Sequence, residues 1–314
     1  MRFVSAYQRN YPYCPSRLTG FERYQNTCAD FTLFCGIQDY SQVGRYTTSP
    51  VVFFDLEEPN RFIVPDQSRD TFASQCRLIL SVCPYTVEWQ RSRGYPVPYE
   101  WVFFPFDETT IPSPMDKVFD VIWTGHIFPQ MVPILQTFQN FKSAIVTGSQ
   151  TQITMPNISV FRNVEHSEKL TLTALSKVSV IKNHITLRPE DVAVIKATPE
   201  LKSHPAFIPV LDGMKVPKIP QIKARTFEAA MCRALILCER DEFNIIERYF
   251  EPEKEFVYFE EGQFSEKMAE VLGNYEKYKS VTEHAYSRMI NNYTTFAFVN
   301  RYLRNIRVDR NVRK

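Results

Sequence analysis

Three charged residues in the second half of the chain have the types and spacing of a phosphate-binding helix. We expect a helix that Pro220 starts and that spans residues 222–233, with Lys223 and Arg225 in its first turns. Cations at that end oppose the helix dipole, and a bound anion such as a diphosphate removes the mismatch. Glu228 follows one turn further along, where a carboxylate can accept hydrogen bonds from ribose hydroxyls. The pattern therefore indicates a site for a nucleoside diphosphate.

The same charges have an ordinary alternative. Arg225 and Glu228 are three residues apart, so they can form an exposed ion pair on one helix face. Such pairs contribute only a few tenths of a kcal/mol and are common on protein surfaces. The spacing alone leaves both interpretations open and favours the ion pair.

Length and composition narrow the class of protein. The chain has 314 residues, with 37 Lys and Arg against 35 Asp and Glu and a formal net charge of +2. A composition that is 44% hydrophobic and 23% charged is typical of a folded protein of one large or two ordinary domains. The near-neutral charge argues against nucleic acid as a partner, because a dedicated binder shows a basic surplus. No apolar run reaches the roughly 18–20 residues of a membrane span. We therefore expect a cytoplasmic protein without a transmembrane segment, and peripheral contact with a membrane stays open.

Glycine and cysteine usage argue against two other kinds of site. There are 9 glycines, where average usage of about 7% would give roughly 22. Neither a glycine-rich dinucleotide fingerprint nor a Walker-type phosphate loop occurs. The number of cysteines is odd, and the gap shared by Cys28/Cys35 and Cys76/Cys83 is wider than zinc sites use. We expect reduced, buried thiols, no metal and no cofactor.

Short apolar runs bounded by polar residues recur along the chain and predict strands. They lie at residues 31–37, 51–55, 77–82, 100–106, 120–125, 143–148, 158–164, 178–183, 234–238 and 256–259. Most are apolar throughout, as strands buried on both faces of a parallel sheet are. Helical patterns lie at residues 129–140 (compromised by Pro133), 166–176, 222–233, 263–279 and from 281 onward. Alternating strands and helices predict an α/β fold with mostly parallel sheets.

Two proline-rich stretches divide the chain. Residues 107–118 break the apolar pattern, and we place the main domain boundary there. Residues 188–220 carry six prolines, which predict a long loop or excursion inside the second domain.

Several segments, taken in order, resemble the donor-binding half of GT-B-type glycosyltransferases, in particular the CgeB-like and family-4-like group. RTFEAAMCRALILCE is similar to the E-A-x-A-x-G pattern of that group, and YFEPEKEF is similar to its F-x-P-G-x-E pattern. A terminal pair of helices follows in both. Upstream, DVIWTGHI resembles the first strand and glycine turn of the donor domain, and WVFFPFDETTIP resembles the interdomain segment. The resemblance covers about residues 100–312.

The resemblance implies a fold of two Rossmann-like domains that face each other across a cleft. The expected domains are an acceptor-side domain at 1–110, a nucleotide-sugar domain at 111–290 and, at 291–314, a C-terminal helix that returns to the first domain. The implied function is transfer of a hexosyl or related sugar to a hydroxyl of a glycan, protein or small molecule. The implied donor is a nucleotide-diphospho-sugar, bound without a metal.

The resemblance also implies roles for single residues. Glu228 would bind the donor ribose, Gly125 would let the backbone approach the diphosphate, and the helix around Thr226 would hold that diphosphate. Lys223 or Arg225 would offset the charge of the leaving group, which needs fixed positive charge where no metal is used.

Two positions depart from the pattern. Pro220 stands where retaining enzymes of this group carry the first glutamate of a Glu-x7-Glu pair, which leaves the stereochemistry open. Arg233 stands where a small residue is usual and indicates an altered turn or a decayed site. A non-catalytic module that keeps the fold is therefore the alternative to an enzyme.

The resemblance does not indicate a catalytic base, but the positions of several acidic residues and one histidine do offer candidates. Asp55, Glu57 and Glu58 follow an apolar strand, at the strand end where α/β folds place ligands, and Asp55 and Glu58 are candidate bases. His126 follows Gly125 and is a candidate for contact with the donor phosphate or sugar. A rival interpretation takes Asp55-Leu56-Glu57 as the D-x-D-like metal site of a GT-A-type transferase. Only 54 residues precede it, which is too few for the usual nucleotide-binding half.

Overall fold

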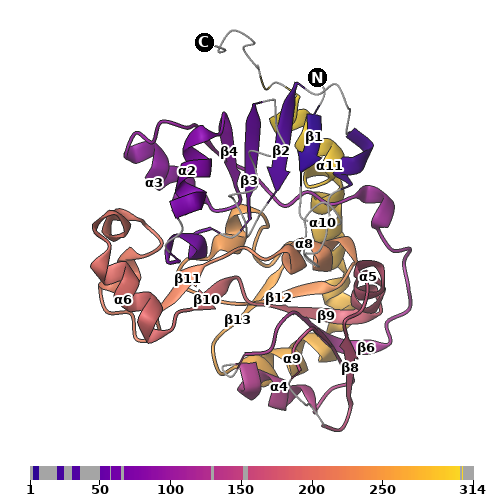
Figure 1. Cartoon of the computed structure of the whole chain (residues 1–314). Helices are drawn as coiled ribbons and strands as arrows, with labels where there is room; N and C mark the ends of the chain where they lie inside the picture. The colour runs from indigo at the N-terminus through magenta and orange to yellow at the C-terminus, as the bar shows by residue number, and fades with distance from the viewer. Residues whose placement is uncertain are drawn as a thin grey trace. The chain divides into compact units, whose positions relative to one another are not determined.

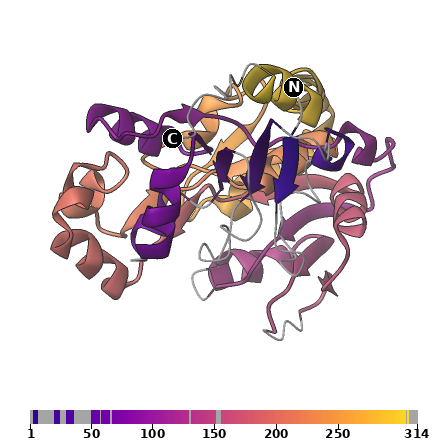
Figure 2. The ribbon, with the colours of Figure 1, turned by 45° about the horizontal axis from the view of Figure 1, so that its top comes forward.

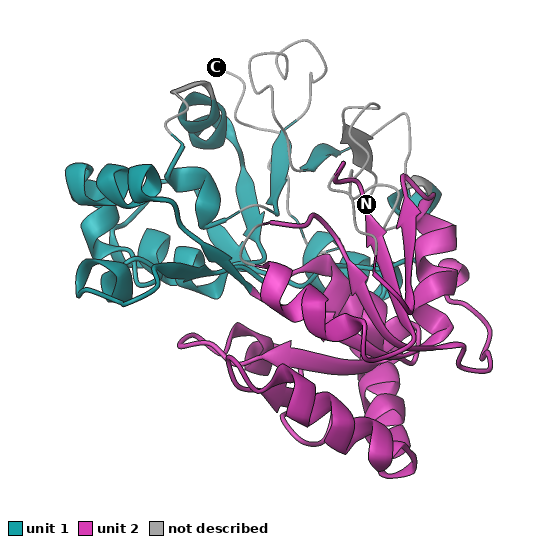
Figure 3. Cartoon of the chain, turned by 90° about the horizontal axis from the view of Figure 1, so that it is seen from below, with its two compact units in different colours: residues 1–107, 184–222, 294–314 teal, residues 108–183, 223–293 magenta. Residues whose placement is uncertain are grey.

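The computed structural model divides the chain into two compact α/β units (Figure 1). Unit 1 comprises residues 1–107, 184–222 and 294–314, and unit 2 comprises residues 108–183 and 223–293 (Figure 3). The structure describes residues 3–6, 20–24, 30–35, 50–56, 58–64, 67–128, 131–150, 155–304 and 306. Each unit has its own parallel sheet, as the alternation of strands and helices predicts.

The sheet of unit 1 has five strands, and every neighbouring pair is parallel. They are β1 (Phe3–Ala6), β2 (Phe31–Cys35), β3 (Val51–Asp55), β4 (Leu78–Ser81) and β5 (Tyr99–Trp101). Their order in the sheet follows the chain from β1 to β5, so the direction of winding does not reverse among the described strands of this unit. In Figure 1, β2, β3 and β4 lie side by side. β1 was not predicted, whereas the apolar runs that predicted β2 to β5 contribute to a buried core with Phe72 and Ala73.

Several short helices accompany this sheet. They are η1 (Phe21–Tyr24), η3 (Asn60–Phe62), α2 (Gln67–Gln75), α3 (Pro84–Ser92), α6 (Pro189–Ala197), η6 (Pro199–Ser203), α7 (Ile208–Leu211), α11 (Thr295–Phe298) and η8 (Val299–Leu303). The last two confirm that the chain returns to the first domain at its C-terminal end. Thr295 N–H donates to the Phe106 carbonyl at 2.8 Å, and the buried Phe298 ring packs against Phe21, Phe54 and Phe103.

The proline-rich excursion differs from its prediction. It is not a loop of the second domain: β10 (His184–Thr186) and β11 (Lys218–Pro220) pair antiparallel, enclose α6, η6 and α7, and belong to unit 1. Figures 1 and 2 both show this segment beside α3. The Trp89 indole N–H donates to Ser203 Oγ at 3.0 Å, and Thr86 Oγ1 lies 3.1 Å from His204 Nε2. Buried apolar side chains of the excursion, which a structureless loop would expose, explain the difference.

The sheet of unit 2 has six parallel strands in the order β13-β12-β9-β6-β7-β8. They are β6 (Phe119–Thr124), β7 (Ser143–Thr147), β8 (Ile158–Arg162), β9 (Ser176–Ile181), β12 (Leu235–Glu239) and β13 (Val257–Phe259). The chain adds β7 and β8 on one side of β6, then returns and adds β9, β12 and β13 on the other. This is the doubly wound order of a Rossmann fold, and its direction reverses between β6 and β9. Ligands of such sheets bind outside the carboxyl ends of the strands at that switch point.

The predicted helices of unit 2 are present with different bounds, and the break between the last two falls at Asn274 and not after residue 279. The helices of this unit are η4 (Glu108–Thr110), α4 (Val132–Phe138), α5 (His166–Ala174), α8 (Ala224–Met231), η7 (Ile245–Arg248), α9 (Phe264–Gly273) and α10 (Tyr275–Asn292). Pro133 lies in the first turn of α4, where a backbone N–H would have no partner within the helix. The missing N–H of proline therefore does not disrupt that helix. Pro220 belongs to β11 and does not start α8, whose first helical residue is Ala224.

Two of the four passages between the units lie within a few residues of the expected boundaries. The first break falls between Asp107 and Glu108, and the C-terminal return falls between Tyr293 and Thr294. The five described cysteines are buried and form no disulfide bond among the described residues, while Cys14 and Cys28 lie outside them. Across the described ranges, no helix combines the length and apolar character needed to cross a bilayer.

Candidate functional site

The amino end of α8 is fixed at the carboxyl end of β9. Lys223 is the N-cap residue, and its N–H donates to Asn183 Oδ1 at 2.9 Å. The Thr226 hydroxyl donates to the same oxygen at 3.0 Å. Asn183 and Thr226 are both fully buried. One side-chain oxygen therefore holds the start of the helix at the switch point of the sheet.

Arg225 lies at the carboxyl end of the neighbouring strand β6. Its guanidinium donates to the Thr124 carbonyl and stacks on the Trp123 ring, 4.6 Å from the centroid. A Cβ on Gly125 would lie only 2.8 Å from Arg225 Nη1, and Gly125 has a φ of 129°. A side chain at this position would therefore clash with the guanidinium as well as strain the backbone. Gly125 thus places a fixed positive charge at the switch point.

Glu228 faces α5, not solvent. It is 2% exposed, and its Oε1 lies 2.5 Å from Lys169 Nζ and 3.9 Å from His166 Nδ1. Burial acts to raise the pKa of Glu228, but the Lys169 ammonium and its hydrogen bond lead the basic contributions that more than offset it, and the pKa lies below its usual range. Burial lowers the pKa of His166 to about 4, although Glu228 opposes the shift, so the imidazole is neutral at pH 7. The exposed Arg225–Glu228 pair is not formed.

His126 is the exposed member of the predicted set. It follows Gly125 at the end of β6, and its Nδ1 lies 3.4 Å from Ser149 Oγ. The same serine oxygen accepts from the Ile127 N–H at 3.0 Å. Ser149 therefore links the loop after β6 to the loop after β7, beside the switch point.

Other residues at this edge were absent from the sequence prediction. Lys182 follows β9 directly, and the buried Glu239 ends β12. The Lys182 Nζ lies 2.6 Å from Glu239 Oε2. Lys182 and Asn183 are the last two residues of the strand predicted at 178–183, so the rule that ligands bind at strand ends would have identified them. Lys169 carried no such signal, because its role depends on the packing of α5 against α8.

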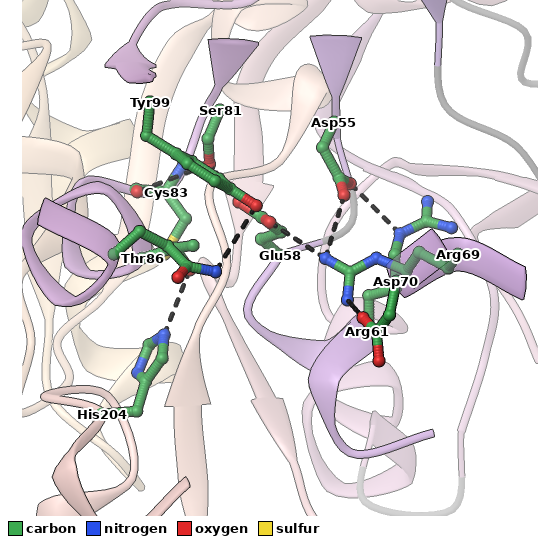
Figure 4. Close-up of polar contacts among 11 residues, drawn as sticks. Asp55, Glu58, Arg61, Arg69, Asp70, Ser81, Cys83, Thr86, Tyr99 and His204 are labelled. Carbon is green, nitrogen blue, oxygen red and sulfur yellow. Dashed lines mark hydrogen bonds and ion pairs between the residues drawn. The ribbon is translucent and has the colours of Figure 1, made fainter. Parts of the chain in front are cut away.

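Asp55 and Glu58 belong to unit 1 and form a buried network (Figure 4). Asp55 Oδ1 accepts from Arg61 Nε at 3.1 Å, and Arg69 Nη2 lies 3.4 Å from Asp55 Oδ2 and 3.1 Å from Glu58 Oε1. The Ser81 hydroxyl donates to Glu58 Oε2. Both carboxyl groups are at most 1% exposed. Asp55 is the last residue of β3 and Glu58 follows that strand, as predicted, but both carboxyl groups are engaged by arginines, and Glu58 also by Ser81 at the end of β4.

The network perturbs Glu58 strongly. Burial and the nearby Asp55 carboxylate raise the pKa of Glu58 to about 8, although Arg69, the Ser81 hydroxyl and Arg61 oppose the shift. Glu57, the third acid of the predicted group, lies outside the described residues. Within the described part of the chain, no cluster of three or more His, Cys, Asp or Glu residues is arranged to hold a metal ion. The catalytic roles of Asp55, Glu58 and His126 stay predictions.

Arg233 keeps the turn that a glycine usually makes. Its φ is 50°, in the left-handed region, and it follows the C-cap residue of α8. The Ala234 N–H donates to the Ala229 carbonyl and the Arg233 N–H to the Ala230 carbonyl, which is the Schellman pattern. The Arg233 guanidinium stacks on Tyr286 and pairs with Glu283 at 3.1 Å. The turn at Arg233 is therefore a Schellman C-cap, and whether the site is decayed stays a prediction.

The chain is similar to known proteins in two ways. One part of it matches a protein family in sequence, and most of its length matches solved structures in fold. Residues 212–304, which include α8, β12, β13 and the C-terminal helices, match the family described as "Glycosyl transferase-like". No curated protein sequence gives a significant match.

Several solved structures share the fold at low identity. Sucrose-phosphate synthase from Thermosynechococcus elongatus superposes with a TM-score of 0.57 and 7% identity, over 91% of this chain and 75% of that one. Anabaena HepE in complex with UDP-glucose superposes with a TM-score of 0.54 and 8% identity, over 87% and 77%. S. aureus TarM, as a mutant in a complex that includes UDP, gives a TM-score of 0.55 and 8% identity, over 87% of this chain. The chain spans only 55% of the TarM chain.

These comparisons confirm the resemblance on which the fold prediction depended, whereas the CgeB-like subgroup stays a prediction. The doubly wound sheet of unit 2, the parallel sheet of unit 1 and the C-terminal return are the parts of that architecture. The chain is thus an α/β protein with the GT-B fold of glycosyltransferases.

Proposed function

We propose that the protein is a glycosyltransferase that moves a sugar from a nucleoside-diphosphate sugar to a hydroxyl of a glycan, protein or small molecule, without a metal. The observation that carries the proposal is the position of Arg225. Its guanidinium lies against Gly125 at the end of β6, beside the start of α8, at the switch point of the unit 2 sheet. The glycosyl transferase-like match over this region and the UDP and UDP-glucose in two of the solved structures support the same donor class.

In this proposal, the residues of unit 2 divide the work of donor binding. The first N–H groups of α8 and the Arg225 guanidinium hold the diphosphate, with Lys223 and Thr226 at the same helix end. Fixed positive charge there stabilises the nucleoside diphosphate as it departs. Glu228 accepts hydrogen bonds from the ribose. His126 is the catalytic candidate that we retain, because it is exposed beside Gly125, whereas Asp55 and Glu58 are enclosed by their own ion pairs.

Calorimetry with UDP and UDP-sugars in the presence of EDTA tests the donor assignment. Arg225→Ala should weaken UDP binding by about 1.5–3 kcal/mol, the range for a hydrogen bond to a charged group. Lys279→Ala is the matched control, because it removes a cation from the exposed face of α10 and should leave the affinity unchanged. Equal affinity of the Arg225→Ala variant and the wild type would defeat the donor site, and a requirement for Mg²⁺ or Mn²⁺ would defeat metal independence.

A binding module without turnover is the second candidate, and the place of Pro220 favours it. In this chain the position of the first glutamate of the Glu-x7-Glu pair lies in β11 of unit 1, paired with His184. Release of UDP from UDP-sugars, measured with and without a panel of glycan and small-molecule acceptors, separates the two. Donor binding with no release under any condition would favour the module.

A further inference from the structure

The carboxylate of Glu228 is held from one side only. Lys169 Nζ and His166 Nδ1 both approach Oε1, at 2.5 Å and 3.9 Å. Among the described residues, the hydrogen bond of the Glu228 carboxylate is the one from Lys169 to Oε1, and Oε2 accepts none. Both partners come from α5, so the contact joins α5 to α8. One oxygen is therefore fixed while the other keeps its capacity to accept.

Lys169 supplies the positive charge of this contact. His166 is neutral at pH 7, because burial lowers its pKa to about 4. Arg225, one turn away on α8, is engaged by the Thr124 carbonyl and the Trp123 ring. A carboxylate that is 2% exposed needs a hydrogen-bonded cation to stay ionised and oriented. The Lys169 ammonium, whose side chain is 20% exposed, meets that need at 2.5 Å.

We propose that Lys169 is a positioning residue for the donor: it fixes Glu228 through Oε1 so that Oε2 accepts from the ribose hydroxyls. This inference rests on the proposed function. A carboxylate that is oriented in advance loses little entropy when the ribose binds. A site built to accept from a sugar hydroxyl discriminates against the analogue that lacks it. Lys169 should therefore control the preference for ribose over deoxyribose.

The test compares the affinities of UDP and 2′-deoxy-UDP, because loss of fold or of phosphate binding would weaken both equally. Wild-type protein should prefer UDP by about tenfold or more, which corresponds to about 1.4 kcal/mol. Lys169→Met should bring that ratio close to one while 2′-deoxy-UDP binds almost as before. Lys169→Arg keeps a charged donor and should retain most of the ratio. Lys177 lies at the start of β9 and pairs with Asp120 of β6. Lys177→Met breaks that ion pair and should leave the ratio of the two affinities unchanged.

The possible results separate the inference from the function on which it rests. If wild-type protein binds neither nucleotide, the proposed function and the inference both fail. If wild-type protein prefers UDP and folded Lys169→Met retains the preference, the inference alone is wrong. Lys169→Gln is the second neutral variant. Failure of both neutral variants to fold, judged by circular dichroism, would assign the ion pair to stability and overturn the positioning role.

Discussion

Two residues of this chain have left-handed backbone conformations at positions where the sequence patterns it resembles carry glycine. Arg233 stands at the glycine of the E-A-x-A-x-G pattern with a φ of 50°, and Glu253 stands at the glycine of F-x-P-G-x-E with a φ of 61°. A left-handed conformation costs an L-residue with a Cβ about 1–2 kcal/mol. The scarcity of glycine therefore does not alter these turns. The surrounding hydrogen bonds and packing hold them, at a cost in local strain.

The strain at Arg233 is measurable by comparing two variants. Arg233→Ala and Arg233→Gly both remove the contacts with Tyr286 and Glu283, but only glycine removes the Cβ. We expect Arg233→Gly to be more stable than Arg233→Ala by about 1 kcal/mol in urea unfolding, because only glycine adopts a positive φ at little cost. At an ordinary helical position alanine is the more stable of the two, so an alanine variant that equals or exceeds the glycine variant would contradict the assignment.

At the scale of single residues, the sequence predicted the charged residues of the candidate site but not the residues that contact them. Lys223, Arg225 and Glu228 could be found because they share one short helix at informative spacing. Lys169 and Asn183 could not be found in the same way, since they reach that helix from α5 and β9 across the fold. Spacing along one element predicts neighbours within it, whereas a contact between elements depends on their packing.

At the scale of elements, strands buried on both faces were the most predictable. All ten predicted strands are present. A short run of apolar residues in such a protein is typical of a strand that is buried on both faces of a parallel sheet. The run at 100–106 is the largest difference: the strand covers only Tyr99–Trp101. Strand β1, helices α2, α3, α6 and α7 and the strands β10 and β11 were not predicted. Two-turn helices such as α2, with only Phe72 and Ala73 in the core of the sheet, carry too little periodicity to detect.

The polar network of unit 1 links three elements and makes their stability depend on pH. Asp55 ends β3, Ser81 ends β4 and Arg69 lies on α2, with Glu58 between them. The pKa of Glu58 is raised from 4.5 to about 8 by burial and by Asp55, so the folded state binds a proton that the unfolded state releases. The stability that Glu58 contributes is therefore complete below pH 4.5 and is lost as the pH rises through 8.

Glu58→Gln tests this dependence between pH 6.5 and 8. His166 and His204 have folded-state pKa values of about 4 and about 3, both lowered by burial, so they add stability as the pH rises but only up to about 6.5. Above that, we expect the urea midpoint of the wild type to fall relative to that of Glu58→Gln. Glu276→Gln, at an exposed position on α10, should follow the wild type. Parallel curves for the wild type and Glu58→Gln would show that Glu58 does not titrate in this range.

At the scale of the whole molecule, the two units are interleaved along the chain. The chain passes from one unit to the other after Asp107, Asn183, Ile222 and Tyr293. The sequence predicted the first and last of these passages from proline content and from the resemblance to GT-B enzymes. It did not predict the middle two, because the burial of Leu201 and Phe207 against Trp89 joins residues more than a hundred positions apart. Local composition predicted an excursion at residues 188–220 but assigned it to the second domain, whereas residues 184–222 belong to unit 1.

Interleaving predicts that a change near the C-terminus affects the unit formed by the N-terminus. Phe298 is fully buried, and its ring lies 5.2 Å from that of Phe54 and 5.5 Å from those of Phe21 and Phe103. Phe298→Ala should cost about 3–5 kcal/mol through lost apolar burial and the cavity left behind. Hydrogen exchange should therefore accelerate first in peptides that cover β2, β3 and β4, although unit 2 is the neighbour of Phe298 in sequence.

The matched control for that change lies two residues earlier in the same helix. Phe296 is 59% exposed, so Phe296→Ala removes the same side chain with an expected effect within about 0.5 kcal/mol. Exchange that accelerates in α8, β12 and α10 of unit 2, with β2 to β4 unchanged, would contradict the assignment of the C-terminal segment to unit 1. Because the substituted side chain lies over 240 positions from Phe54 in the chain, protection lost at β3 would report the tertiary contact itself and not an effect of sequence proximity.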